Sequence, residues 1–240
     1  MLQNLQDLYR TKLAASDGGI GHVQDFYFDD KTWVVRYLVV DTGPWLAGRL
    51  VLLTPHVLGS LDLVGKTLQV NLSKKQIEES PSIESHQPVS RQYEIDYYRY
   101  YGLPAYWDGG AMWGLGGFPS ALPLAHGRGG QGQHQHRNDK HLQSVQAVTG
   151  YHIQSLDGAI GHLSGMKVDD QSWAIRELVV ETGHWFAGRA ILLSPDKVTS
   201  ISYEDSKVFV NLTQAEIRQA GEYELSHAGT GNEGAGTFRD

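Results

Sequence analysis

The chain has 240 residues, a net charge of −7 and a pI of about 5.8. This acidic balance argues against a surface for direct nucleic-acid binding, and the absence of cysteine excludes disulfides, thiolate metal ligands and cysteine nucleophiles. The first residues lack the basic and apolar regions of a signal peptide, and no segment has the roughly 18 uninterrupted apolar residues of a membrane helix. We therefore expect a soluble, cytoplasmic protein without membrane insertion, for which peripheral membrane association stays open.

The sequence repeats itself at a fixed offset of 140 residues. The segment DGGIGHVQDFYFDDKTWVVRYLVVDTG, which begins at Asp17, matches DGAIGHLSGMKVDDQSWAIRELVVETG, which begins at Asp157. Over 62 aligned positions, residues 17–78 and 157–218 share 26 identities without a gap. This similarity indicates the tandem duplication of one unit of about 75 residues, with a spacer of about 65 residues between the copies.

Each repeat is predicted to form short β-strands separated by polar turns. In the first repeat, runs of β-branched and aromatic residues alternate with turn residues. The expected strands are residues 20–28, 33–40, 49–53, 60–63 and 67–72. Pro55 should end the third of these strands, because proline cannot donate a ladder hydrogen bond. Several short strands with regular turns are typical of a small barrel or sandwich.

A short helix is predicted to follow the strands of each repeat. SKKQ at residues 73–76 and TQAE at residues 213–216 both match the capping box, in which a hydroxyl side chain at the N-cap and a Glu or Gln three residues later bond reciprocally to the backbone. Because the motif occurs at the same place in both copies, it predicts a helix start in each.

The spacer begins with an aromatic segment, RQYEIDYYRYYGLPAYW, from Arg91 to Trp107. Tyrosines at positions 93, 97, 100 and 101 recur at helical spacing, so a short amphipathic helix is predicted to end at Gly102. Tyrosine has an apolar body and a polar tip, which suits a half-buried interface. We expect the segment to fold back onto a barrel or onto a second subunit, and a site for an external partner is the alternative.

The rest of the spacer differs in composition. Residues 108–140 are rich in glycine, glutamine and histidine and are predicted to form an irregular linker, and residues 226–240 a disordered tail. Imidazole clusters can bind zinc or copper, so a metal-binding role is one alternative for His126, His134, His136 and His141. A flexible stretch does not fix ligand geometry, and no metal site is assigned.

Three motifs occur in the same order in both repeats: D-G-x-I-G, then D-D-x-x-W-x-x-R-x-L-V-V-D/E-T-G, then A-G-R-x-x-L-L-x-P. Together they resemble the PRC-barrel domain, and the chain is similar to stand-alone bacterial proteins with two such domains. The resemblance implies a mainly β fold, with two tandem small barrels, each followed by a short helix and joined by a long linker. It also relates the chain to the cytoplasmic domain of the photosynthetic reaction centre H subunit and to the C-terminal domain of the ribosome maturation factor.

On this resemblance we expect the first PRC-barrel at residues 1–80 and the second at residues 144–225. The linker is expected at residues 81–143, with the tyrosine-rich segment at residues 91–107 inside it. The disordered tail at residues 226–240 completes this organisation.

The resemblance implies an adaptor or interaction module rather than a catalyst. We find neither the membrane helix of the reaction-centre subunit nor the N-terminal domain of the maturation factor, so we expect neither role to transfer directly. We expect a non-catalytic scaffold, without a cofactor, that binds an unidentified protein partner and self-associates as a homo-oligomer. The alternatives are a ribosome-assembly factor that binds a basic ribosomal protein and a peripheral partner of a photosynthetic or other membrane complex.

The sequence contains no GxSxG, HExxH, P-loop or GxGxxG motif, so no catalytic residue is assigned. The candidate site residues are instead aromatic residues that could bind a partner. Trp33 and Trp173 are expected in the barrel cores. Trp45 and Trp185 follow the Thr-Gly pair of each repeat and are expected to be more exposed. With the aromatic residues of the spacer, the candidate partner-binding set is Tyr93, Tyr97, Tyr100, Tyr101, Trp107, Trp45 and Trp185.

Overall fold

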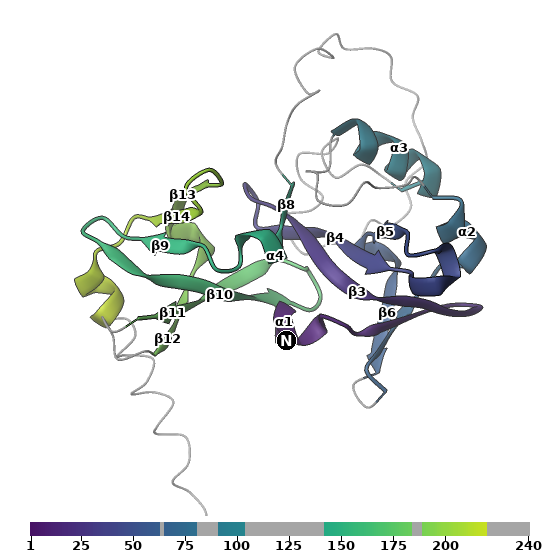
Figure 1. The fold of residues 1–240 in the computed structure, drawn as a ribbon, viewed down its shortest axis with the longest axis horizontal. Helices are drawn as coiled ribbons and strands as arrows, with labels where there is room; N and C mark the ends of the chain where they lie inside the picture. Colours follow the sequence, from purple (N-terminus) through teal and green to yellow (C-terminus); the bar gives the residue numbers. More distant parts are fainter. Residues whose placement is uncertain (63–64, 81–90, 104–141, 184–188, 220–240) are drawn as a thin grey trace, which may run out of the picture. The chain divides into compact units, whose positions relative to one another are not determined.

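A computed structural model describes residues 1–62, 65–80, 91–103, 142–183 and 189–219, with the backbone alone for residues 91–93 (Figure 1). The described chain is mainly β, as the sequence predicts, and it contains two sheets of seven strands each. The two sheets belong to two compact units. Unit 1 contains Met1, Gln6–Ala147 and Asp169–Ala174, and unit 2 contains Leu2–Leu5, Val148–Val168 and Ile175–Asp240.

The sheet of unit 1 has the strand order β5-β4-β3-β2-β7-β6, with β8 added along β3. Strands β2 and β7 run parallel, and the other pairs run antiparallel. The strands are β2 (Lys12–Ala15), β3 (Gly18–Asp29), β4 (Val34–Asp41), β5 (Leu50–Leu53), β6 (Leu58–Asp62), β7 (Thr67–Val70) and β8 (Leu142–Ser144).

The sheet of unit 2 repeats this order as β12-β11-β10-β9-β14-β13, with β1 added along β10. Strands β9 and β14 are the parallel pair. The strands are β1 (Leu2–Asn4), β9 (His152–Gln154), β10 (Ala159–Asp169), β11 (Ile175–Thr182), β12 (Ala190–Leu193), β13 (Val198–Ser202) and β14 (Lys207–Val210). The duplication in sequence is therefore a duplication of topology.

Equivalent apolar residues form the buried core of each unit. The buried apolar positions of unit 1 recur in unit 2 at the repeat offset, which shows that both sheets fold around the same set of sites. The matched pairs are Leu13 and Ile153, Ile20 and Ile160, Val23 and Leu163, Phe26 and Met166, Leu38 and Leu178, Val40 and Val180, Val51 and Ile191, Leu53 and Leu193, Leu68 and Val208, and Val70 and Val210.

The helices are short, and none of those described is long and apolar enough to cross a membrane. Both predicted capping boxes form: the Ser73 hydroxyl accepts from the Gln76 N–H at 3.3 Å, and the Thr213 hydroxyl accepts from the Glu216 N–H at the same distance. Among the described residues the labelled helices are α1 (Leu5–Leu8), α2 (Lys74–Glu78), α3 (Arg91–Tyr101) and α4 (Val145–Val148), and the 3-10 turns are η1 (Gly43–Leu46), η2 (Pro55–Val57) and η4 (Pro195–Lys197). Residues 214–219, which follow the second capping box, are also helical.

The Ile-Gly-His motif of both repeats has a steric cause. A Cβ atom on Gly21 would lie 1.9 Å from the carbonyl oxygen of Asp41, and one on Gly161 would lie 2.0 Å from that of Glu181. Only glycine permits so close an approach of two backbones. The glycine of this motif therefore allows the close approach of the two longest strands of each repeat, β3 and β4 in unit 1 and β10 and β11 in unit 2.

Each sheet is completed by the first strand of the other repeat. In unit 2, β1 pairs with β10, and in unit 1, β8 pairs with β3. Leu2 and Leu142 are separated by the repeat offset, so β1 and β8 are equivalent strands that have exchanged places. The exchange was not predicted, because a pairing between segments so far apart in sequence has no local signature.

A buried carboxylate holds the exchanged segment in unit 1. Asp25 on β3 accepts hydrogen bonds from the Ser144 hydroxyl, from the Gln146 N–H at 3.0 Å and from the Tyr9 hydroxyl at 3.3 Å. It thereby satisfies an N–H at the start of α4 that the helix itself leaves unpaired. The equivalent residue in the second repeat is Gly165, so unit 2 has no such carboxylate.

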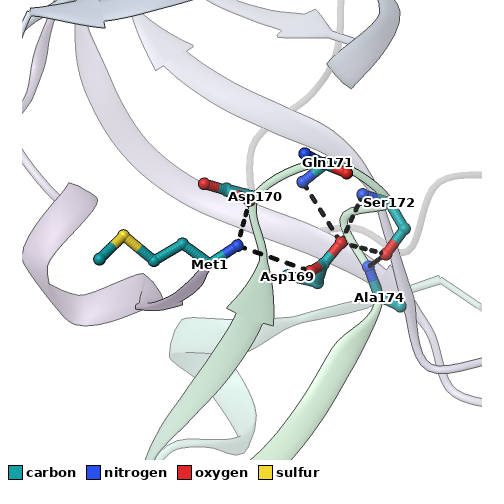
Figure 2. A network of polar contacts seen from close by, with 6 residues as sticks. All are labelled: Met1, Asp169, Asp170, Gln171, Ser172 and Ala174. Carbon is teal, nitrogen blue, oxygen red and sulfur yellow. Dashed lines mark hydrogen bonds and ion pairs between the residues drawn. The ribbon is translucent and has the colours of Figure 1, made fainter.

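A turn of the second repeat, Asp169–Ala174, also belongs to unit 1. The Val35 N–H donates to the Trp173 carbonyl oxygen at 2.9 Å. The amino group of Met1 lies 2.7 Å from the Asp170 carboxylate, while Asp169 accepts from the Ser172 N–H at 2.8 Å and thereby closes the turn (Figure 2). The polar network therefore joins the start of the chain to a turn near residue 170.

The exchange predicts that a substitution in one repeat destabilises the unit built from the other. Leu5 and Val145 occupy equivalent positions and are fully buried, Leu5 in unit 2 and Val145 in unit 1. Leu5→Ala should destabilise unit 2 by about 2–5 kcal/mol through the cavity it leaves. Hydrogen exchange by mass spectrometry should then show faster exchange in β10 and β11, with β3 and β4 unchanged.

Val145→Ala is the matched control and should give the reverse pattern, with faster exchange in β3 and β4. If Leu5→Ala instead loosened β3 and β4, the strand exchange would be wrong.

A second prediction concerns the pH dependence of stability. Burial raises the pKa of Asp25 above its ordinary value of 3.8, against hydrogen bonds that lower it. Above pH about 4 the folded protein therefore holds a proton at Asp25 that the unfolded chain has released. The free energy of unfolding of the wild type, minus that of Asp25→Asn, should fall as pH rises from about 4 until the folded carboxyl has ionised.

Urea unfolding of both proteins between pH 4 and pH 7 measures this difference. Asp157→Asn is the control of opposite sign, because a hydrogen bond from the Gln214 N–H lowers the pKa of Asp157. A difference for Asp25 that rises with pH would show that the hydrogen bonds outweigh burial.

Candidate functional site

The helix predicted from the tyrosine spacing is α3, which ends at Tyr101. Gly102 follows in the left-handed conformation, with φ of 64°, and stops the helix. Figure 1 shows α3 in unit 1, beside β4 and β5.

Helix α3 closes a second apolar cluster in unit 1. Tyr97 is fully buried, its ring centroid lies 5.2 Å from that of Tyr37 in an edge-to-face contact, and its hydroxyl accepts from the Thr54 N–H at 3.0 Å. The Tyr37 hydroxyl in turn donates to buried Glu94 at 3.2 Å. The cluster draws on β3, β4, β5, α3 and the exchanged strand β8, and comprises Tyr27, Tyr37, Val39, Leu52, Tyr97, Tyr98 and Leu142.

The difference between the repeats explains why α3 covers unit 1. Tyr27 and Tyr37 are cross-strand partners on β3 and β4. The equivalent pair in unit 2 is Lys167 and Glu177, whose charged atoms lie 2.9 Å apart. An aromatic pair needs an apolar cover, whereas an ion pair is compatible with solvent.

The candidate tyrosines differ in how far their side chains are buried. Tyr97 lies in the cluster, Tyr101 is partly buried, and Tyr100 is 39% exposed, with its hydroxyl donating to the Gln76 carbonyl oxygen at 2.9 Å. Burial raises the pKa of Tyr101 to about 12, so its hydroxyl stays protonated near neutral pH. Trp107, Trp185, the side chain of Tyr93 and the four spacer histidines lie outside the described residues.

The two tryptophans expected in the barrel cores lie at turns instead. Trp33 and Trp173 are half-buried and have φ of 55° and 56°, just before the strands that they were predicted to join. The Trp33 ring stacks on Phe28 with centroids 5.5 Å apart. The centroid of the Trp173 ring lies 6.4 Å from that of Phe26, so both rings contact aromatic residues of β3.

Trp45 lies on η1, where the sequence placed an exposed aromatic residue. Pro44 starts this 3-10 turn, and Ala47 ends it in the left-handed conformation, with φ of 53°. The Trp45 side chain is half-buried, and the Lys74 ammonium lies 4.6 Å from the centroid of its ring, within the range of a cation–π interaction. The turn and the ammonium hold the indole in place at the surface.

Trp45 borders an open concavity of about 620 Å³ on unit 1. The wall is formed by β2, β3 and η1, and glycine backbone gives it depth, since Gly19, Gly21 and Gly43 all line it. The side chains that set its chemistry are Arg10, Lys12, Ile20, His22, Pro44 and Trp45.

A row of polar side chains crosses the strands beside this concavity. Lys12 pairs with His22 across β2 and β3, and His22 pairs with Asp41 across β3 and β4. The His22 Nε2 lies 3.8 Å from the Asp41 carboxylate, which also accepts from the Gly43 N–H at 2.8 Å. Asp41 is thus engaged by its neighbours. The repeat symmetry contains a signal for this row, because His162 and Glu181 form the same pair at 3.3 Å.

The family model of the PRC-barrel domain matches residues 6–77, which hold the strands β2–β7, η1 and the concavity. No curated protein matches the chain. The predicted family resemblance is therefore confirmed for the first repeat.

The burial of α3 predicts unequal effects of two tyrosine substitutions. Tyr97→Phe removes the acceptor of the buried Thr54 N–H and should lower the free energy of unfolding by about 1–3 kcal/mol. Tyr100→Phe removes a hydroxyl at the surface and should change it by less than about 0.5 kcal/mol. Urea denaturation measures both, and equal effects would contradict a structural role specific to Tyr97.

Proposed function

We propose that this chain, which carries a PRC-barrel domain at residues 6–77, is a non-catalytic interaction module that binds a protein partner through the concavity of unit 1. Membership of this domain family supports a protein-interaction role at a general level. The placement of Trp45 supports the specific surface.

The single observation that carries the proposal is the half-exposed indole of Trp45, in contact with the Lys74 ammonium, at the edge of the concavity. The concavity of about 620 Å³ is open to solvent, so a segment of a protein partner can reach it. Tryptophan is enriched among residues that dominate binding energy, because it offers a large apolar area at low entropic cost. The cation–π contact with Lys74 reduces that cost further by orienting the ring in advance.

The surface extends from Trp45 along α2 to a second aromatic residue. Lys74, at the start of α2, lies over the Trp45 ring, and the carbonyl oxygen of Gln76 accepts a hydrogen bond from the hydroxyl of exposed Tyr100. A partner that covered this part of unit 1 would meet two aromatic side chains with a polar helix between them. That composition, apolar anchors with a polar rim, is the usual one for a protein–protein interface.

Photo-crosslinking in cells that naturally express the protein tests the proposal. A benzophenone amino acid at position 45 should crosslink to one discrete protein, which mass spectrometry identifies. Tyr203 in unit 2 is the matched control, because it is an aromatic residue with 38% exposure outside the concavity.

The same probe at position 203 should not capture that protein. Identical products from both positions, or no protein product from position 45, would contradict the proposal.

A further inference from the structure

Arg10 occupies a backbone position that favours glycine. Its φ is 62°, in the left-handed region, and the equivalent residue of the second repeat is Gly150, with φ of 93°. Both N–H groups make the same hydrogen bond, Arg10 to the Val23 carbonyl oxygen at 2.9 Å and Gly150 to that of Leu163 at 2.7 Å. The turn is therefore the same in both repeats, and only the first tolerates a conformational cost to hold a long cationic side chain.

A second difference adds charge at the same place. Lys12 lines the concavity beside Arg10, and the second repeat has His152 at that position. Both positions have the same backbone pairing, since Lys12 pairs with Thr67 and His152 with Lys207 in the parallel strand pairs. The fold therefore requires neither cation. At these two positions the first repeat carries two positive charges that the second lacks when His152 is neutral.

Arg10 and Lys12 are both exposed to solvent. Within the described part of the chain, neither side chain forms an ion pair or a hydrogen bond. The nearest acid in the row, Asp41, is already engaged by His22 and by the Gly43 N–H. In a chain of net charge −7, a pair of unneutralised cations beside an aromatic residue marks a local site for negative charge.

We propose that the concavity binds an acidic segment of a protein partner, with carboxylates on Arg10 and Lys12 and an apolar side chain against Trp45 and Pro44. This inference rests on the proposed function and names the chemistry of the partner. Arginine matches carboxylate geometry with its planar guanidinium, and lysine adds a second point charge. Complementary charge would also speed association and make binding sensitive to salt.

A nucleic acid fits the same site less well. Phosphate recognition depends on many cations along a backbone, whereas this rim carries two and the whole chain is acidic. An acidic peptide needs only a few contacts and supplies the apolar side chain that the indole can cover.

Fluorescence anisotropy on the full-length protein tests the inference with two labelled hexapeptides. One contains aspartate and glutamate around a central phenylalanine, and the other has asparagine and glutamine in their place. The test variant is Arg10→Gly/Lys12→His, which installs the residues of the second repeat. It should fold well, because glycine relieves the left-handed strain at position 10.

The wild type should bind the acidic hexapeptide at least about tenfold more tightly than the neutral one, and the double variant should lose at least about tenfold in affinity for it. Raising the salt concentration should weaken the wild-type complex and leave the residual binding of the variant nearly unchanged. Equal affinity of wild type and variant, or equal affinity for both peptides, would overturn the inference. Tighter binding of a labelled oligothymidine than of the acidic hexapeptide would overturn it in favour of nucleic acid.

Combining this test with photo-crosslinking separates the two proposals. If the double variant still crosslinks its partner through position 45 at the wild-type level, the acidic-segment inference fails while the interaction module stands. If position 45 captures no protein and the acidic hexapeptide does not bind, both fail.

Discussion

The hydrogen bonds that the Asp25 carboxylate accepts are the interactions on which unit 1 depends. It lies on the longest strand of the sheet and accepts hydrogen bonds from a strand and a helix that begin the second repeat. A buried carboxylate is costly unless its neighbours donate to it, so the exchanged segment and Asp25 stabilise each other. With that segment in place, Leu142 joins the tyrosine cluster, and α3 gains part of the apolar surface that it covers. Asp25 is thus linked to the cover of unit 1 through the exchanged segment.

The two repeats share one fold but differ in the residues that surround its core. Many core positions match pair by pair, whereas other positions differ in kind: Tyr27 against Lys167, Asp25 against Gly165, and Arg10 against Gly150. Each of these changes adds a feature to the first repeat, a covering helix, an anchor for the exchanged strand or a charged rim. Duplication permits such divergence, because one copy can retain the simpler form while the other acquires contacts.

Local chemistry in the sequence predicted much of the fold. The capping boxes and the tyrosine spacing each depend on residues within a few turns of each other, and the structure contains both. The ungapped repeat showed in addition that the same pattern of elements occurs twice. The strand exchange was not predictable in this way, because β1 and β10 are some 150 residues apart. The concavity was missed for a different reason. Its cations precede Asp17, where the repeat comparison began, and extending the comparison to Arg10 and Gly150 would have exposed the difference in charge.

The exchange also has a consequence for the order in which the protein can be made. Unit 1 includes Leu142–Ser144, so a ribosome must translate the whole spacer before the first sheet can receive its seventh strand. The strand at Leu2–Asn4 has its partner β10 only after residue 169 has left the exit tunnel. Neither sheet can therefore be complete before strands of the second repeat have been translated.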